Sequence, residues 1–483
     1  MRHLFMWKFS QETKMNVPLG PKTHLVFLTL LEIIIYADKS FLNAAQALLK
    51  NENIVTKDDN SGILATLFVV GFMLASPIFT AMGRRSPRAS IYSIIVGMLL
   101  WMSSLILSFF LSNSLVWLCV MRFLAGAGQA SFISFAPAII DKASPLGSAS
   151  LYMGIYFMAI YIGSALGFVL GGMFTSWGSA RYMYLGWAVL ALPFVSFFYI
   201  NRDRFLVPTY QTVSNTSSTA STANDSESVL PSKMAMLKRI ISTPSFMLLA
   251  VGYGAFIFYV GGLAFWAPVM VQNIYPGWTS SSAAFMFGAI TAATGIVGTI
   301  TGGCIVAKVD AKYAGSEKPR AKGCSVDGLR CHLSSRISFW MILAALPLVL
   351  TLPWVGNAYA FFALVGFAEL LMFASTAPVN IAIMAAVPEE LKSTAMGVSA
   401  LFSHALGDVP SPYLIGFFRK PSFWGITQED VANQRALFIC ALPLIVTTLF
   451  WLAASKTARI QGRKDFDKNA EKLEHKIDDP IAV

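Results

Sequence analysis

Apolar runs of about 20 residues recur along this chain from one end to the other. Each run is long enough for an α-helix to cross about 30 Å of hydrocarbon. Of all residues, 55% are hydrophobic and only 13% are charged, whereas soluble domains contain about 25% charged residues. Such a chain cannot hide its apolar surface from water. The sequence therefore predicts one membrane-embedded body and not a set of soluble domains.

Twelve runs are predicted as membrane spans, six in each half of the chain. In the first half they cover residues 23–45, 61–82, 89–111, 114–141, 149–172 and 181–200. In the second half they cover residues 244–271, 283–307, 336–355, 359–387, 393–419 and 433–455. Backbone amides cannot go unpaired in lipid, and a β-barrel would show short alternating strands. The predicted fold class is an all-α membrane protein with two six-helix halves, residues 23–200 and 244–455.

Basic residues predict the orientation, because Lys and Arg concentrate in cytoplasmic loops. Of the 36 Lys and Arg residues, 28 fall in the two tails and the even-numbered loops. The N-terminal tail, residues 1–22, and the C-terminal tail, residues 456–483, are therefore predicted to be cytoplasmic. The net charge of +11 is mostly this signal. A basic soluble domain for nucleic acid is absent from the pattern, so no nucleic-acid partner is expected.

The longest interruption of the apolar pattern, residues 201–243, lies between the two halves. It contains a run rich in Ser, Thr and Asn at residues 209–232, and such low hydrophobicity predicts a largely disordered cytoplasmic linker, open to phosphorylation. The six-plus-six layout is that of the major facilitator superfamily, whose halves are parallel repeats. A faint repeat agrees with it, because Ala136-Pro137 recurs as Ala377-Pro378. A duplicated transporter is favoured over a receptor or a channel.

Ionisable residues inside the spans are costly in lipid and normally face a cavity or a partner. The candidates of this kind are Glu32, Asp38, Lys39, Arg122, Glu369 and Asp408. Arg122 and Gln129 share one helix face, and Arg122 is placed to meet Asp38. A carboxylate beside a guanidinium can exchange that partner for a proton. The alternative is that the two charges neutralise each other and lock two helices together.

Two further pairs follow from helical spacing. Glu32 precedes Lys39 by seven residues, and lysine side chains point back toward the helix N-terminus, so a structural ion pair between them is expected. His404 and Asp408 are four residues apart and share a face. The pair is either pH-sensitive or a cap on a kink, because Pro410 is predicted to break the helix.

The eleventh span carries the most specific motif in the chain. Residues 403–416, SHALGDVPSPYLIG, closely resemble the SHxLGDxxSPYLIG signature of the Spinster family of lipid transporters. The resemblance extends to residues 36–41, 122–137, 262–268 and 287–298. It implies a secondary-active, alternating-access carrier of lysophospholipids or sphingosine-1-phosphate-like lipids, monomeric, in a late endosomal, lysosomal or plasma membrane. It also implies that Asp38 and Arg122 belong to the proton and substrate machinery.

Three residues depart from the family pattern. Gln129 stands where the family has a glutamate, Lys39 where it has an arginine, and Arg84 where it has an aspartate that gates the cytoplasmic side. Gln129 cannot ionise, so a second proton site is lost or moved. Transport is therefore a firmer expectation than coupling to protons by the family's route.

A lysolipid site needs a few polar anchors beside a long apolar wall. The predicted substrate contacts are Arg122, Gln129, Phe135, Tyr259, Trp266, Glu369, His404 and Asp408. Phe132, Phe256, Phe258 and Phe265 extend the aromatic wall, although aromatic residues also serve in ordinary helix packing. Two alternatives stay open: a facilitator for a small polar solute, such as a sugar or an organic anion, and a membrane sensor or scaffold that transports nothing.

Motifs for covalent chemistry are missing from the sequence. There is no P-loop and no set of nucleophile and base, so an enzyme is not expected and no cofactor is predicted. Cys324, Cys331 and His332 are placed in a cytoplasmic loop, where their spacing is too wide for a zinc site. No metal site is predicted.

Overall fold

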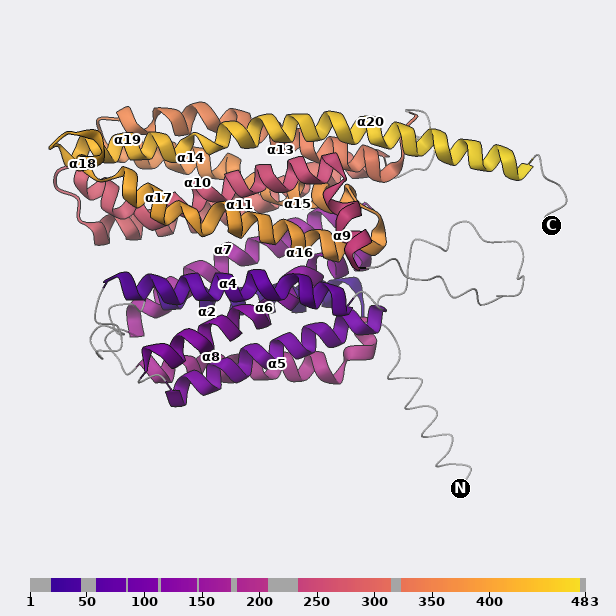
Figure 1. Ribbon diagram of the computed structural model, residues 1–483, viewed down its shortest axis with the longest axis horizontal. Helices are drawn as coiled ribbons and strands as arrows, with labels where there is room; N and C mark the ends of the chain where they lie inside the picture. Colours follow the sequence, from indigo (N-terminus) through magenta and orange to yellow (C-terminus); the bar gives the residue numbers. More distant parts are fainter. Residues whose placement is uncertain are drawn as a thin grey trace, which may run out of the picture.

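The computed structural model describes residues 19–44, 58–83, 86–111, 114–145, 147–174, 180–206, 233–313 and 323–477. Within these ranges the chain forms helices and turns, and no strand. The helices lie in two bundles side by side, with the first half of the chain below and the second half above in Figure 1. The predicted all-α fold class is thereby confirmed for the part of the chain that the structure describes.

The first bundle, called the N half, is built from six long helices. They are α2 (Pro21–Ala44), α4 (Asp58–Gly83), α5 (Pro87–Leu111), α6 (Leu115–Ala143), α7 (Ala149–Phe174) and α8 (Ala180–Ile200). Helix α6 is the most enclosed of them, because α4 and α5 pack along its sides. Its glycines permit this closeness: a Cβ at Gly126 would lie 1.9 Å from the Phe68 carbonyl oxygen of α4. Its polar side chains are thereby buried within the N half.

The second bundle, called the C half, contains more interruptions. Its elements are α10 (Pro244–Ile274), α11 (Ser280–Tyr313), α13 (Val326–Thr351), η3 (Leu352–Trp354), α14 (Ala358–Ala374), α15 (Thr376–Ala385), η4 (Glu389–Leu391), α16 (Lys392–Ser403), η5 (His404–Asp408), α17 (Pro410–Phe418), α18 (Pro421–Trp424), α19 (Glu429–Ala441) and α20 (Pro443–Ile477). Each predicted span overlaps one or more of the helices in the N half or the C half.

Within the residues that the structure describes, ten helical segments are long and apolar enough to cross a membrane. Two predicted spans are not among them. Helix α2 falls short because it carries Glu32, Asp38 and Lys39, and the eleventh span, which is divided into α16, η5 and α17, is also missing from the ten. Both of these spans carry predicted site residues.

The eleventh span is interrupted before Pro410, as predicted: η5 ends at Asp408, and α17 begins at Pro410 and continues to Phe418. The form of the interruption was not predicted, because the chain widens into the π-helical turn η5, in which the Val409 N–H donates to the His404 carbonyl oxygen at 3.1 Å. This wider turn accommodates Pro410, which has no N–H and clashes with an ordinary helix. The Trp266 indole N–H then donates to the Pro412 carbonyl oxygen at 2.7 Å.

The linker and the tails also differ in part. Helices η1 (Arg202–Phe205) and α9 (Lys233–Ile241) lie within the linker that was predicted to be largely disordered, and residues 207–232 and Arg84 lie outside the described residues. Helix α20 continues to Ile477, past the predicted end of the last span. Cys331 and His332 belong to α13 and not to a loop, and His332 contacts the Ser455 carbonyl oxygen at 2.7 Å.

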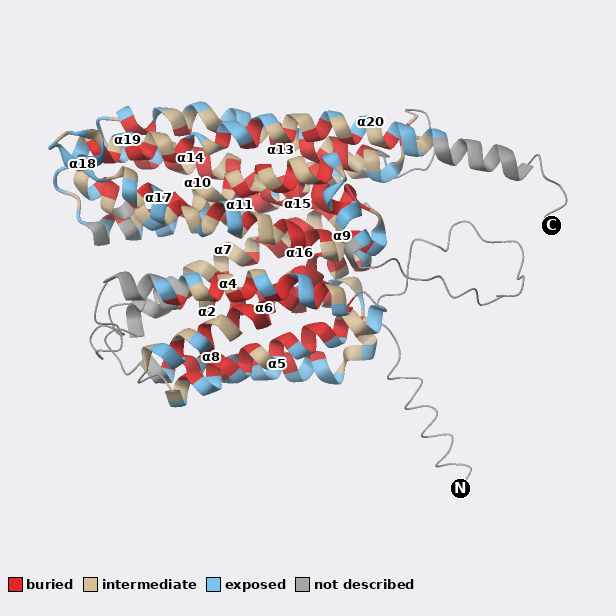
Figure 2. Ribbon diagram, viewed as in Figure 1, coloured by how far each residue is buried: buried red, intermediate tan, exposed pale blue. Residues whose placement is uncertain are grey.

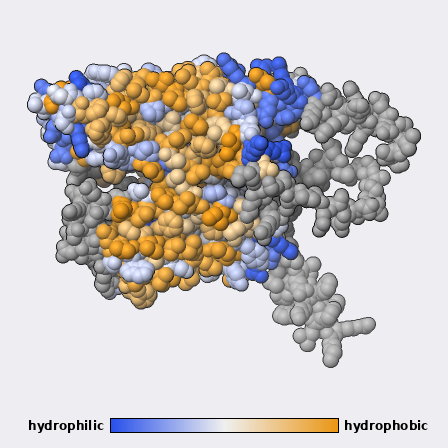
Figure 3. All heavy atoms as spheres, viewed as in Figure 1, coloured by the Kyte–Doolittle hydropathy of each residue, from blue (hydrophilic) through white to orange (hydrophobic). Residues whose placement is uncertain are grey.

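Buried residues concentrate inside each half and along the seam between the halves (Figure 2). On the outside, hydrophobic residues cover the middle of the molecule, and hydrophilic residues gather at its ends (Figure 3). Helix α2 begins and α8 ends at the same end of the molecule, where the Leu19 N–H donates to the Arg204 carbonyl oxygen at 2.9 Å. We call this end the basal end. The opposite end is called the distal end.

Candidate functional site

The Asp38 carboxylate on α2 is fully buried in the N half, with 0% exposure. One of its oxygens lies 3.6 Å from Arg122 Nη1. The other accepts hydrogen bonds from the Trp101 indole at 3.1 Å and from the Gln129 amide at 3.4 Å. The structure thus brings Asp38, Arg122 and Gln129 together as the sequence predicts. Each of these partners presents an N–H group to the carboxylate, which has only acceptor atoms when ionised.

Arg122 has spare donor capacity. Its guanidinium lies over the Tyr184 ring, 4.9 Å from the centroid, in a cation–π contact that suits a desolvated arginine. Its Nε and Nη2 atoms have no hydrogen-bond partner of good geometry, although Arg122 is only 2% exposed. Five N–H donors with so few acceptors mark Arg122 as a group that could accept a further anionic partner.

A small cavity lies beside the Asp38 cluster, between the two halves. Lys39, Gln129 and His404 supply its polar lining. The apolar part of its wall comes from Ile35, Tyr36, Phe68, Val69, Phe72 and Ile133. The Lys39 ammonium lies 5.7 Å from the Tyr36 ring centroid and 6.0 Å from that of Phe68. A cation and an amide of the N half and an imidazole of the C half therefore share a cavity whose apolar lining belongs to the N half.

His404 and Asp408 form the predicted pair. His404 Nδ1 lies 2.7 Å from Asp408 Oδ2, and the imidazole meets the Phe72 ring of the N half edge-on, with centroids 4.9 Å apart. The π-helical turn η5 turns both residues toward the seam. Gly261 on α10 permits η5 to pack closely against α10, because a Cβ at that position would lie 3.0 Å from Asp408 Oδ1. His404 is the only one of the two residues that lines the cavity.

Glu32 does not form the expected ion pair with Lys39. The Lys39 ammonium nitrogen, which like Glu32 belongs to the described residues, lies more than 4.0 Å from the carboxylate oxygens of Glu32. It lies over the rings of Tyr36 and Phe68 instead. Glu32 is 1% exposed and faces Tyr156 of α7. Its Oε2 atom has no hydrogen-bond partner. The prediction of a structural ion pair was therefore wrong, because aromatic rings hold the Lys39 ammonium at the cavity.

Glu369 lies apart from the other candidates, on α14 of the C half. Thr291 Oγ1 lies 3.0 Å from each of its carboxyl oxygens, and Thr294 Oγ1 lies 3.2 Å from Oε2. The side chain is 7% exposed. Among the described residues, no Lys, Arg or His nitrogen lies within 4.0 Å of it. The sequence flagged the residue, but the structure does not place it in the cavity.

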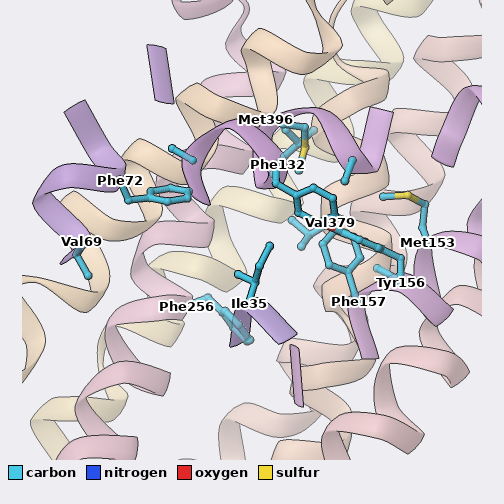
Figure 4. Close-up of a cluster of buried hydrophobic side chains, with 14 of the residues drawn as sticks. Ile35, Val69, Phe72, Phe132, Met153, Tyr156, Phe157, Phe256, Val379 and Met396 are labelled. Carbon is cyan, nitrogen blue, oxygen red and sulfur yellow. The ribbon is translucent and has the colours of Figure 1, made fainter. Parts of the chain in front are cut away.

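The aromatic residues predicted as a substrate wall separate into several places. Phe132 and Phe256 belong to a buried apolar cluster that also contains Val69, Phe72 and Met396 (Figure 4). The others lie elsewhere. Phe135 packs against Gly83, Tyr259 is buried beside Cys440, Phe258 is partly buried against the core, Phe265 is 52% exposed, and Trp266 is covered by the Arg419 guanidinium at 4.3 Å.

A second charged cluster, which sequence reasoning missed, joins the halves at the basal end. We call it the Asp141 cluster; its members are Asp141, Lys142 and Ser150 of the N half and Asp310, Arg330, Glu389 and Lys392 of the C half. Asp141 lies 3.1 Å from Arg330 Nη1 and 3.0 Å from Lys392 Nζ. Ser150 donates to Asp310, and Lys142 lies 3.0 Å from Glu389. The sequence signal that could have identified this cluster is the presence of opposite charges at helix ends that are predicted to lie on the same side of the membrane.

Other partners were also missed, because no local pattern marks them. Trp101 and Tyr184 belong to helices α5 and α8 and reach the Asp38 cluster only through the fold. Thr291 and Thr294 are ordinary span residues in the sequence. No cluster of three or more His, Cys, Asp or Glu side chains arranged to hold a metal ion occurs in the described part of the chain.

Comparisons with known proteins identify the family of the chain. The family model of the Major Facilitator Superfamily matches residues 28–412. A probable sphingolipid transporter, spinster homolog 3 of Arabidopsis thaliana, is 28% identical over 436 residues, which cover 86% of this chain and 77% of the relative. The sphingosine-1-phosphate transporter SPNS2 of Xenopus tropicalis is 28% identical, covering 89% and 80%. These relatives confirm the resemblance inferred from residues 403–416.

Two solved structures share the fold. A bacterial homolog of the human lysosomal transporter Spinster, described as inward-facing and unoccupied, has a TM-score of 0.57 and 16% identity, covering 92% of this chain and 98% of its own. The major facilitator transporter FucP, in its outward conformation, has a TM-score of 0.61 and 14% identity, covering 89% and 98%. At such identities the likeness shows the fold alone.

Proposed function

This chain belongs to the Major Facilitator Superfamily, and we propose that it carries single-chain lipids with an anionic head group across a membrane by alternating access. Family membership makes it a membrane transporter and not an enzyme. The substrate class proposed is that of sphingolipid phosphates and lysophospholipids. The names of the similar plant and frog proteins, which are described as transporters of sphingolipid and of sphingosine-1-phosphate, support that class.

The observation that carries the substrate proposal is the set of residues that line the small cavity at the seam, whose volume of about 10 Å³ would have to widen to admit a lipid. Lys39 and Gln129 of the N half and His404 of the C half offer donors there, and aliphatic and aromatic side chains complete the lining. A phosphate head group is recognised by such charge-assisted hydrogen bonds, and an acyl chain needs an apolar surface. Gln129 connects the cavity to Asp38, and Asp38 in turn contacts Arg122, whose Nε and Nη2 atoms have no hydrogen-bond partner of good geometry. A small sugar would leave the apolar wall unmatched.

The Asp141 cluster supports alternating access. It holds the two halves together at the basal end, and the other contacts between the halves described above lie in the middle of the bundle. Ser76 Oγ on α4 also donates to the Gly397 carbonyl oxygen on α16 at 3.3 Å. Opening of the basal end would break these contacts, so the conformation described is closed there. Asp141 supplies most of this closure, because the more exposed pair of Lys142 and Glu389 contributes little.

The basal end is proposed to face the cytoplasm, because it carries most of the basic residues. We place the protein in a late endosomal, lysosomal or plasma membrane, as a monomer, on the strength of the family resemblance. The Asp38 cluster contributes fixed charge beside the cavity. The group that carries protons is considered separately below.

Flux measurements in liposomes test the proposal. The reconstituted protein should move fluorescent sphingosine-1-phosphate and lysophosphatidylcholine faster than empty vesicles do, and should not move fucose. Lys39→Met keeps the length of the side chain and removes its charge. Because a hydrogen bond to a charged group contributes about 1.5–3 kcal/mol, we expect apparent affinity for sphingosine-1-phosphate to fall about 10- to 100-fold.

The matched control is Lys456→Met, on an exposed position of α20, which should transport as the parent does. Lysophosphatidylcholine, whose head group carries no net charge, should respond less to Lys39→Met than sphingosine-1-phosphate. Fucose flux without lipid flux would establish the small-solute alternative. Absence of any flux, with retained binding of a partner protein, would favour the scaffold.

A further inference from the structure

Glu369 is a buried carboxyl group that has no role in the transport mechanism proposed above. We propose that Glu369 takes up and releases the proton during transport, and that it is the neutral carboxylic acid in the conformation described here. This inference rests on the proposed transport function, because it names the group that would link the function to a proton gradient. It assigns that role to the C half, on the opposite side of the seam from Asp38.

The hydrogen bonds around Glu369 are complete only for the neutral acid. Thr294 has one hydroxyl proton, and its Oγ1 lies 2.7 Å from the Ile290 carbonyl oxygen but 3.2 Å from Glu369 Oε2. The shorter contact is the usual bond of a helical threonine to its own backbone. A lone pair of Thr294 therefore faces Oε2. An ionised carboxylate can only accept, whereas a protonated one can donate to Thr294.

The charges around Glu369 lead to the same conclusion. Tyr161 on α7 and Tyr259 on α10 are the titratable groups that interact with it electrostatically, and both are neutral phenols. On α13, Arg330 is bound to Asp141 and Asp310, and His332 contacts Ser455. On α11 the facing groups are threonines. A charged carboxylate left without a cation in a buried site costs several kcal/mol.

The position of Glu369 links its protonation to the seam between the halves. Tyr161 of the N half is wedged between α11 and α14: a Cβ at Gly295 would lie 2.3 Å from its ring, and the Phe373 ring lies 4.4 Å away. Gly295 follows Thr291 by four residues, and Phe373 follows Glu369 by four, so each pair shares a helix face. Tyr161 thus lies one turn from the carboxyl group on both helices.

Loss of the proton would change this region. Glu369 would release H⁺ to water, and the resulting carboxylate would compete with Ile290 for the Thr294 hydroxyl or draw water to itself. Either change alters the surface of α11 on which Tyr161 rests. The protonated form therefore favours the seam as described, and the ionised form favours its loosening. This is a two-state element that a proton can bias.

Infrared difference spectroscopy on the reconstituted full chain tests the protonation directly. After a pH step, the parent should show the carbonyl band of a protonated carboxyl group, and Glu369→Gln should lack one such band. Two control variants should retain the band assigned to Glu369. Glu32→Gln alters another buried carboxyl group that forms no ion pair among the described residues, and Glu390→Gln alters an exposed one. An unchanged spectrum for Glu369→Gln overturns the proposal.

Flux under a pH gradient tests the coupling. The measured quantity is the ratio of sphingosine-1-phosphate flux with the gradient to flux without it. We expect a ratio above one for the parent and for Glu390→Gln, and a ratio of one for Glu369→Gln. A parent ratio of one, or an unaltered ratio for Glu369→Gln, overturns the role in coupling. If the parent moves no lipid at all, the proposed function fails, while the infrared result still decides the protonation of Glu369.

Discussion

Asp38 and Glu369 are both buried carboxyl groups, one in each half of the bundle, but their surroundings differ. Asp38 meets a guanidinium, an indole N–H and an amide N–H. Among the described residues, Glu369 meets two threonine hydroxyls, one of which is bound to its own backbone. The first environment stabilises a charge, and the second suits a neutral acid. Burial alone therefore does not tell which intramembrane carboxyl can exchange a proton.

The comparison predicts the largest effect for a change at Arg122. Arg122→Met leaves the Asp38 charge buried without its cation, which costs about 3–5 kcal/mol in the free energy of unfolding. The double variant Asp38→Asn with Arg122→Met removes both charges and should recover part of that loss. Reversible unfolding of the three proteins in detergent micelles measures the difference. If the double variant were no more stable than Arg122→Met, Asp38 would not be the ionised partner that we describe.

The smallest effect is predicted for Glu369→Gln. A glutamine amide can donate to Thr294 as the neutral acid does, so the free energy of unfolding should change by less than about 1 kcal/mol, the size of one ordinary hydrogen bond. Asp38→Asn, which leaves Arg122 unpaired, should cost several kcal/mol in the same assay. A large loss in Glu369→Gln would erase the contrast between the two sites and indicate an ionised Glu369.

The sequence predicted the helices well and their partners poorly. Apolar length located ten of the spans, because lipid leaves the backbone few alternatives to a helix. The pairing of Asp38 with Arg122 was also predictable, since two opposite charges at similar depth in one bundle have strong reason to meet. Trp101 and Tyr184 could not be predicted, because aromatic residues are common in spans and their direction depends on helix packing.

One correction and one refinement have physical causes that a sequence does not display. Lys39 does not reach Glu32, because its ammonium lies over the rings of Tyr36 and Phe68 at the cavity. The helix is interrupted before Pro410 as predicted, but the π-helical turn η5 that forms the interruption was not predicted. The wider turn is what brings His404 to the cavity wall. The helix with the clearest family motif thus had the least predictable shape.

Mapping the contact site of a photoreactive sphingosine-1-phosphate analogue tests the central claim most directly. Helix α4 offers an internal comparison, since Phe68, Val69 and Phe72 line the cavity while Leu74 and Ile78 are 58% exposed on the outside. We predict that the analogue labels the first group and that unlabelled sphingosine-1-phosphate prevents this labelling. Labelling confined to Leu74 and Ile78, or insensitive to competition, would contradict a lipid site at the seam between the halves.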